Sequence, residues 1–290
     1  MQFRTDLAIE ATEMGSTDLP SGVKQESKEV EDIKLTKIII ENEEGEKALG
    51  RPRGTYITAE MPPLSDDEEH MEQKAKMLGG ELGSLLPENG AVLVVGLGNQ
   101  SVTPDALGPR AAGLVLATRH IEGEFARSTG LDKLRPAAVF VPGVLGQTGV
   151  ESSEMVKGIC NIVKPAVVIV IDALAARSVD RLGCTFQFCN TGIAPGSGVG
   201  NNRMALNQDT LGVPVIGLGV PTVVDARTVA MELTGREDAG NAVTPRGAEM
   251  MVTPREIDLI IRRASQLVAM TINAALQPDY SPLSLMSAAG

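Results

Sequence analysis

The chain has 290 residues and a formal net charge of −11 at pH 7, and 43% of its residues are hydrophobic. This length and composition allow a sizeable core in a globular protein. The negative charge opposes nucleic acid binding, which depends on clustered Lys and Arg, and an aromatic content of 2% leaves few rings for base stacking. We therefore expect no direct nucleic acid binding.

The cysteines and the apolar runs indicate a cytoplasmic protein. Cys160, Cys184 and Cys189 cannot all pair and lack the doubled CxxC spacing of a zinc site, so reduced thiols are expected. No apolar run approaches the roughly 18 residues that span a membrane, and the N-terminus lacks the apolar segment of a signal peptide. We therefore expect no membrane partner.

The N-terminal part is predicted to contain an arm, a strand pair and a helix. Residues 15–34 are polar with almost no apolar periodicity, which predicts a flexible arm ending before a folded domain that begins near residue 35. Two β-branched runs, 35–42 and 54–61, predict an edge strand pair joined by a turn-rich segment. Residues 65–86 predict a helix that Gly79 and Gly80 interrupt. Its acidic start, Asp66 to Glu69, indicates a solvated helix end rather than a metal site.

The middle of the chain alternates between apolar runs and helical segments. Strands are predicted at 91–99, 137–143 and 165–174, with helices at 106–120, after an N-cap at Thr103 and Pro104, and at 151–164. Continuous apolar runs are typical of parallel strands buried on both faces. The alternation therefore predicts an α/β fold with a mostly parallel central sheet flanked by helices.

The C-terminal part continues this pattern. Strands are predicted at 184–192 and 213–224, with a glycine-rich loop at 193–202 between them. Thr253, Pro254 and Glu256 have the spacing of a helix start, and a long apolar-striped helix follows, with Pro278 just past its end. Residues 227–252 are expected to be a mixture of helix and loop near the functional site.

The known nucleotide and hydrolase motifs do not match. The Gly-x-Gly at 96–98 lacks the third glycine of the dinucleotide fingerprint, because Ser101 stands at that position. Walker A, HExxH and GxSxG sequences are also absent. His70 and His120 are the only histidines, and each is expected to be an ordinary helix residue, so His-based catalysis has few possible bases. The chemistry is therefore expected to depend on carboxylates, with no metal or other cofactor.

Two aspartates follow the predicted core strands. Asp105 comes shortly after the first strand and Asp172 closes the third, and open α/β sheets place their sites at the carboxyl ends of parallel strands. Two carboxyls in one cleft share a proton, so one can act as base and the other as acid. The alternative is a structural role, in which Asp105 complements a helix dipole and Asp172 caps a turn.

Three further side chains are candidates for orienting a substrate or stabilising an oxyanion. These are Asn99, Arg110 and Arg177, and each has an equally good structural interpretation.

Several long motifs together resemble one known family. They are FRTDLAIEA, NEEGEKALGRPRGTYITAE, VVGLGNQSVTPDALGPR, VPGVLGQTG and VIDALAARSVDRLGCTFQFCNTGIAPGSGVGN, and they occur in the order seen in the germination proteases of spore-forming bacteria. The resemblance extends from about residue 3 to the C-terminal helix. It implies an endopeptidase of the atypical aspartic type that degrades small acid-soluble spore proteins in the spore core during germination. Asp105 and Asp172 match the family's proposed catalytic aspartates.

The resemblance also implies a fold similar to the hydrogenase-maturation endopeptidases, assembly as a homotetramer, and synthesis as a self-processing zymogen. Target sites in the family tend to have an acidic residue followed by an apolar residue and Ala, as in Asp6, Leu7 and Ala8. We therefore expect a propeptide at 1–6 cleaved between Asp6 and Leu7, a flexible arm at 7–34 and a single α/β peptidase domain at 35–290. The alternatives are a nickel-dependent maturation-type endopeptidase, although neither histidine matches that group's nickel-contacting His, and a non-catalytic module that binds spore proteins.

Overall fold

The computed structural model describes residues 5–14, 19–66, 70–197, 203–236, 238–243 and 250–289. Most of the expected propeptide, residues 15–18 of the expected arm, Asp67 to Glu69 and the end of the glycine-rich loop lie outside these ranges. Within the described residues, no helix combines the length and the apolar content that crossing a membrane requires. The three cysteines are buried and unpaired, as expected.

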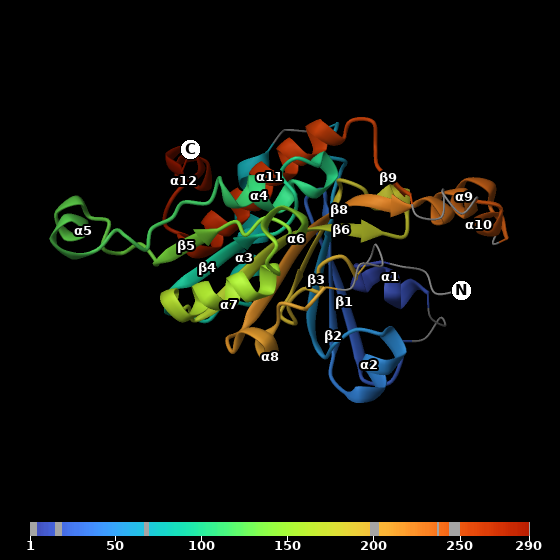
Figure 1. Cartoon of the computed structure of the whole chain (residues 1–290), viewed down its shortest axis with the longest axis horizontal. Helices are drawn as coiled ribbons and strands as arrows, with labels where there is room; N and C mark the ends of the chain where they lie inside the picture. Colours follow the sequence, from blue (N-terminus) through green and yellow to red (C-terminus); the bar gives the residue numbers. More distant parts are fainter. Residues whose placement is uncertain are drawn as a thin grey trace.

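A single sheet passes through the molecule in the order β1-β2-β3-β7-β8-β6-β4-β5, with β9 beside β8 (Figure 1). Its described strands are β1 (Val23–Val30), β2 (Ile33–Ile40), β3 (Gly54–Glu60), β4 (Val92–Gly96), β5 (Ala137–Phe140), β6 (Val167–Ala176), β7 (Thr185–Cys189), β8 (Val215–Asp225) and β9 (Met251–Val252). The described helices are α1 (Ala8–Glu13), α2 (Glu43–Leu49), α3 (Met71–Gly83), α4 (Leu107–Ala112), α5 (Gly123–Thr129), α6 (Leu145–Thr148), α7 (Ser152–Val163), α8 (Gln208–Leu211), α9 (Ala226–Thr234), α10 (Ala239–Ala242), α11 (Ile257–Leu276) and α12 (Pro282–Ala289).

The sheet has a parallel half and an antiparallel half. Strands β8, β6, β4 and β5 pair in parallel, whereas β1, β2, β3, β7 and β8 pair antiparallel, and so do β8 and β9. The α/β class and the helix-flanked central sheet are confirmed. The sheet is mixed rather than mostly parallel. The strands that precede the βαβαβ segment, β1 to β3, and the strand that follows it, β7, extend the sheet with antiparallel pairing.

The two faces of the sheet are covered by different elements. Val92 and Val94 of β4 pack with side chains of α3, α4 and α11, whereas Leu93 and Val95 face α7. The second face is shared, because Leu7, Ala8 and Ile9 cover its antiparallel half, beside Ile38 of β2 and Leu174 of β6. Asp172 of β6 lies on this second face, between the α7 layer and the N-terminal segment.

The prediction of a flexible arm is wrong for most of the described residues in this segment. Residues 8–13 form α1, and residues 23–30 form β1, which pairs along its whole length with β2. Only Val23 of β1 is buried, because the strand is at the sheet edge and both of its faces meet solvent. An edge strand of this kind carries charged residues and shows no apolar alternation, so its sequence resembles that of an arm.

Gly79 and Gly80 do not interrupt α3. A Cβ on Gly79 would lie 2.7 Å from the Cβ of Ala274, so the glycine lets α3 approach α11 closely. Gly80 faces open space, where an added Cβ would meet no neighbouring group within 4 Å. The predicted break is therefore wrong, because Gly79 is needed for the packing of two helices and does not end one.

Three local predictions also need correction. The segment between β2 and β3 contains the helix α2, capped by the Asn42 side chain, rather than turns alone. The helix predicted at 106–120 ends at Ala112. Thr253 does not cap α11, which begins at Ile257, because its hydroxyl donates instead to Thr222 O.

Gly79→Ala and Gly80→Ala are expected to have opposite effects on stability. The Gly79 change forces a Cβ against Ala274 and should lower the free energy of unfolding by about 1–3 kcal/mol, as overpacking does. The Gly80 change fills open space and should raise it by about 0.5–1 kcal/mol through helix propensity. Urea unfolding of both variants measures this, and equal effects would contradict the packing role of Gly79.

Candidate active site

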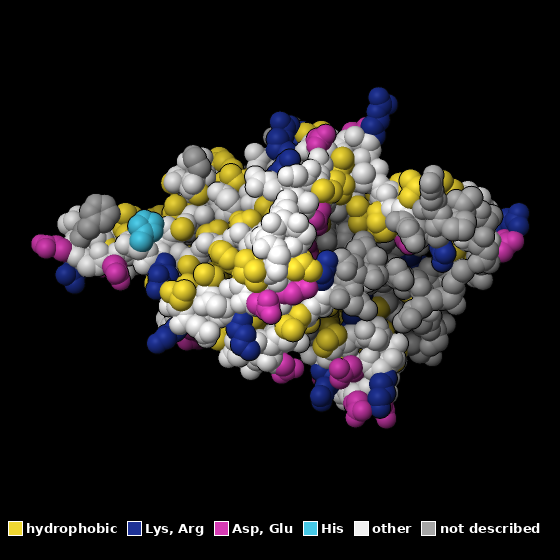
Figure 2. Space-filling model, in the orientation of Figure 1, with side chains coloured by type: hydrophobic (Ala, Val, Ile, Leu, Met, Phe, Trp, Pro, Cys, Tyr) yellow, Lys and Arg dark blue, Asp and Glu magenta, His cyan; other side chains and the backbone are white. Residues whose placement is uncertain are grey.

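A cavity of about 530 Å³ opens at the carboxyl ends of β4 and β6. It is lined by Asp6, Leu97, Gly98, Val102, Pro104, Asp105, Val144, Leu145, Gly146, Glu151, Ser152, Ser153, Asp172, Ala173, Ala175, Pro195, Gly196, Arg203, Met204, Leu206, Thr222, Val223, Met251 and Thr253. Most of these side chains are apolar, and hydrophobic side chains also gather on the surface over α6 and α7 (Figure 2). The Ser153 and Thr222 hydroxyls are buried and have no hydrogen-bond partner among the described residues.

Asp172 lies within β6, at the point where the neighbouring strand stops. The last residue of β4, Gly96, pairs with Ile171, and β6 continues to Ala176. The side chain of Asp172 is buried, and its Oδ1 accepts a hydrogen bond of 2.9 Å from the Ala173 N–H. Burial raises the pKa of Asp172 well above its ordinary value, and the carboxylates of Asp105 and Asp6 raise it further. This carboxyl therefore favours its protonated form.

Asp105 faces the same cavity from the short 3₁₀ turn Thr103–Asp105 that follows β4. Its Oδ2 accepts a hydrogen bond of 2.7 Å from the Asn99 N–H. Gly98 has a φ of +116°, and a Cβ there would lie 2.0 Å from Asp105 O, so the turn needs glycine at this position. Burial raises the pKa of Asp105, and the Asn99 bond opposes that rise. The two carboxyls thus differ, because only Asp172 is also raised by neighbouring carboxylates.

The edge of β6 beyond the end of β4 is occupied by the chain's own N-terminal segment. Asp6 N–H donates to Ala175 O at 2.9 Å, and the Asp6 carboxylate accepts from Ala175 N–H at 2.9 Å and from the Ser197 hydroxyl at 2.7 Å. Asp6 also lines the cavity with Asp105 and Asp172. Three carboxyl groups from distant parts of the chain therefore line one cavity.

Gln187 of β7 holds the main chain on both sides of the Asp6–Leu7 peptide bond. Its Nε2 donates to Asp6 O at 2.9 Å, and its Oε1 accepts from Ala8 N–H at 2.6 Å. Gln187 was not among the candidates from sequence. The available signal was a glutamine within a strand of otherwise buried residues, because a buried amide must find partners.

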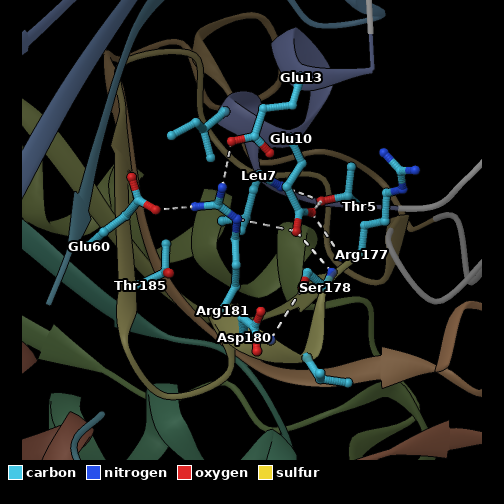
Figure 3. Close-up of polar contacts among 12 residues, drawn as sticks. Thr5, Leu7, Glu10, Glu13, Glu60, Arg177, Ser178, Asp180, Arg181 and Thr185 are labelled. Atoms are coloured by element: carbon cyan, nitrogen blue, oxygen red, sulfur yellow. Dashed lines mark hydrogen bonds and ion pairs between the residues drawn. The ribbon is translucent and has the colours of Figure 1, made fainter. Parts of the chain in front are cut away.

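A buried ionic cluster holds α1, the helix that follows the Asp6–Leu7 peptide bond (Figure 3). Glu10 of α1 is 2% exposed, and its carboxylate accepts from the N–H groups of Arg177 and Ser178 and from the Thr5 hydroxyl. The Arg181 guanidinium forms ion pairs with Glu10, Glu13 and Glu60 at 3.6, 2.6 and 2.7 Å. The cluster ties α1 to the end of β6 and to β3.

The other candidates are placed as follows. Asn99 supports Asp105 through its N–H, and its side-chain Oδ1 accepts from Ser101 N–H and from Gln147 Nε2. Arg110 lies on α4, and the described lining of the cavity does not include it. Arg177 lines a separate hollow with Glu10 and Glu13. The structure therefore brings Asn99 into contact with Asp105, and none of the three candidates is among the described residues that line the cavity.

The histidines lie elsewhere. His70 precedes α3, and His120 is exposed in the connection after α4. Among the described residues, no group of three or more His, Cys, Asp or Glu side chains is arranged to hold a metal ion.

Comparison with known proteins identifies the class as a peptidase. A model of the family described as germination protease matches residues 5–236. A germination protease of Caldanaerobacter subterraneus is 43% identical, covering 96% of this chain and 95% of the relative. A germination protease of Clostridium perfringens is 41% identical, covering 95% of this chain and 95% of the relative. That of Priestia megaterium is 35% identical, covering 95% of this chain and 94% of the relative. The chain belongs to the germination protease family.

The comparison with solved structures gives a more distant likeness. A NiFe hydrogenase maturation protease of Thermococcus kodakarensis is 18% identical, with a TM-score of 0.37, and the match covers 66% of this chain and 98% of the other.

The contribution of Asp172 to the stability of the uncleaved chain is expected to fall as the pH rises above 3.8, the ordinary pKa of this side chain, towards its raised pKa in the fold. In this range the folded chain keeps a proton that the unfolded chain has released, so the free energy of unfolding decreases with pH. Asp172→Asn removes the titration and keeps the Oδ1 acceptor for Ala173. It should be more stable than wild type at neutral pH and depend less on pH, as measured by urea unfolding. The exposed control Asp132→Asn should follow wild type, and a neutral-pH loss of stability in Asp172→Asn would contradict the shift.

Arg181→Met is expected to lower the free energy of unfolding by about 3 kcal/mol, because it leaves the buried Glu10 carboxylate without its cation. Amide hydrogen exchange of residues 8–13 should also become faster. Arg236→Met is the matched control, since its ion pair with Asp238 is exposed and should contribute little. Equal losses in the two variants would show that the cluster does not anchor α1.

Proposed function

We propose that the protein is an endopeptidase that degrades small acid-soluble spore proteins in the spore core during germination, and that it is made as a self-processing zymogen. Membership of the germination protease family supports the peptidase activity and the link to germination. The same family resemblance motivates the homotetramer and the spore-protein substrates as parts of this proposal.

The observation that carries the proposal is the position of the Asp6–Leu7 peptide bond. Asp6 lines the same cavity as Asp105 and Asp172, and hydrogen bonds from Ala175, Gln187 and Ser197 hold it there. The proposal is that this bond lies close enough to the carboxyl pair for attack, since a bound substrate must already be close to its attacking geometry.

The different environments of the two aspartates assign their roles. Asp105, steadied by the Asn99 N–H, is the base that takes a proton from water, and the resulting hydroxide adds to the carbonyl carbon of Asp6. Asp172, buried and protonated, gives its proton to the leaving nitrogen of Leu7 as the C–N bond breaks. The products are the new carboxyl group of Asp6 and the new amino group of Leu7, and the proton on Asp105 restores the pair by transfer to Asp172.

The same contacts explain how a short propeptide can inhibit. Asp6 fills the edge of β6 beyond Ile171, which is where the main chain of a second peptide would have to lie to reach both aspartates. The segment therefore competes with substrate by occupying its place rather than by distorting the aspartates.

Asp105→Asn and Asp172→Asn are each expected to slow self-cleavage by about 10²–10⁴-fold, the usual contribution of acid–base catalysis. Both variants should also fail to cut a peptide that contains an acidic residue, an apolar residue and Ala in sequence. Mass analysis and N-terminal sequencing measure the products, and the mature wild-type chain should begin at Leu7.

The control is Asp132→Asn, which changes an exposed aspartate outside the cavity and should process at the wild-type rate. Retained cleavage in either cavity variant would refute the aspartate mechanism. A mature chain that begins elsewhere would refute the proposed cleavage site.

A further inference from the structure

We propose that Gln187 is a catalytic residue of this peptidase, in which its side-chain amide stabilises the oxyanion formed at the cleaved carbonyl. This inference rests on the proposed cleavage between Asp6 and Leu7. If that bond is cleaved, Asp6 O is the oxygen on which negative charge develops, and Gln187 Nε2 already donates to it at 2.9 Å.

The second end of the same amide fixes its orientation. Gln187 Oε1 accepts from Ala8 N–H at 2.6 Å, so the oxygen must face this donor and the NH₂ group must face Asp6 O. If the amide were reversed, its NH₂ group would face the Ala8 N–H, and its oxygen would face Asp6 O. Neither pair could form a hydrogen bond. The donor is therefore aimed at the cleaved carbonyl before any reaction begins, which is the preorganisation that oxyanion stabilisation needs.

The backbone that carries Gln187 is rigid. β7 lies in the interior of the sheet, and Gln187 pairs with Thr58 of β3 on one side and Gly219 of β8 on the other. Its side chain is 6% exposed, so water competes little for the amide. A hydrogen bond in such surroundings is stronger than one in solvent.

A neutral donor also suits a site that must keep a proton. Lys or Arg beside the carbonyl would favour the ionised form of Asp172 and so remove the acid. Arg203 is the only Lys or Arg among the described residues that line the 530 Å³ cavity, and it forms an ion pair with Glu151 at 3.2 Å. Arg51 shares the smaller hollow with Gln187, but its guanidinium donates to Thr5 O rather than to Asp6 O. Glutamine stabilises the oxyanion without releasing or accepting a proton, so the exchange among water, Asp105, Asp172 and the leaving nitrogen remains balanced.

The test is the first-order rate of self-cleavage in the full chain, because no binding step precedes it when the substrate is part of the same molecule. Gln187→Met, which removes the donor, is expected to lower this rate by about 10²–10³-fold, as loss of one oxyanion donor does. Gln187→Glu keeps the acceptor for Ala8, and it should be equally slow once the pH is high enough to ionise the new carboxyl group, which then cannot donate. Far-UV circular dichroism shows which variants are folded. Because Met and Glu differ in charge and polarity, one variant can still test the proposal if the other does not fold.

The pH dependence separates catalysis from mere anchoring. The ratio of the Gln187→Glu rate to the wild-type rate should rise as the pH falls, because a protonated carboxyl can donate to Asp6 O, and the Gln187→Met ratio should stay low throughout. The titratable groups that share the hollow with Gln187 are Asp6, Arg51, Tyr56, Asp172 and Cys189. They are common to all the proteins compared, so dividing by the wild-type rate removes their direct contribution.

Gln25→Glu is the matched control, since it makes the same change at an exposed position of β1 and should cleave like wild type. Cleavage of Gln187→Met within about threefold of wild type, with both aspartate variants inactive, would overturn only the role of Gln187. If wild type does not cut at Asp6–Leu7, or if the aspartate variants retain activity, the proposed function fails and the Gln187 role fails with it.

Discussion

The geometry of the cavity depends on the hydrogen bonds that hold residues 5–10 against the ends of β6 and β7. β4 stops at Gly96 while β6 continues, so the main chain of Ala175 is left to pair with Asp6 instead of a strand. Gln187 fixes the next peptide units, and the Glu10 cluster prevents α1 from shifting. Without these contacts the cavity would be an open groove on the second face of the sheet.

Charge is distributed unequally between the cavity and the Glu10–Arg181 cluster beside it. In the cluster around Glu10, the Arg181 guanidinium forms ion pairs with Glu10, Glu13 and Glu60. In the cavity, Asp172 lies beside Asp105 and Asp6, and neighbouring carboxylates raise its pKa. The cation of the cluster is therefore paired with the carboxylates around it, whereas the cation of the cavity, Arg203, is paired with Glu151 and not with an aspartate. This difference distinguishes an anchor from a site suited to proton transfer.

The sequence predicts the part of the fold that depends on local pattern. The apolar runs that became β4, β6 and β8 are buried on both faces, and such runs are recognisable without knowing their partners. β1 was missed because an exposed edge strand has no apolar face, and Gly79 was misjudged because its contact is with α11. Asp105 and Asp172 were placed at strand ends by the same local reasoning. Gln187 could not be found this way, because its partners are main-chain atoms 181 and 179 positions earlier.

The sequence separation of these contacts also determines when the cavity can exist. Asp6 emerges from the ribosome long before its partners Ala175, Gln187 and Ser197, which follow it by 169, 181 and 191 residues. A nascent or truncated molecule thus contains the Asp6–Leu7 bond long before it contains the groups that surround it. The contacts that hold Asp6 can therefore form only after the chain has been made as far as Ser197 and this part of it has folded.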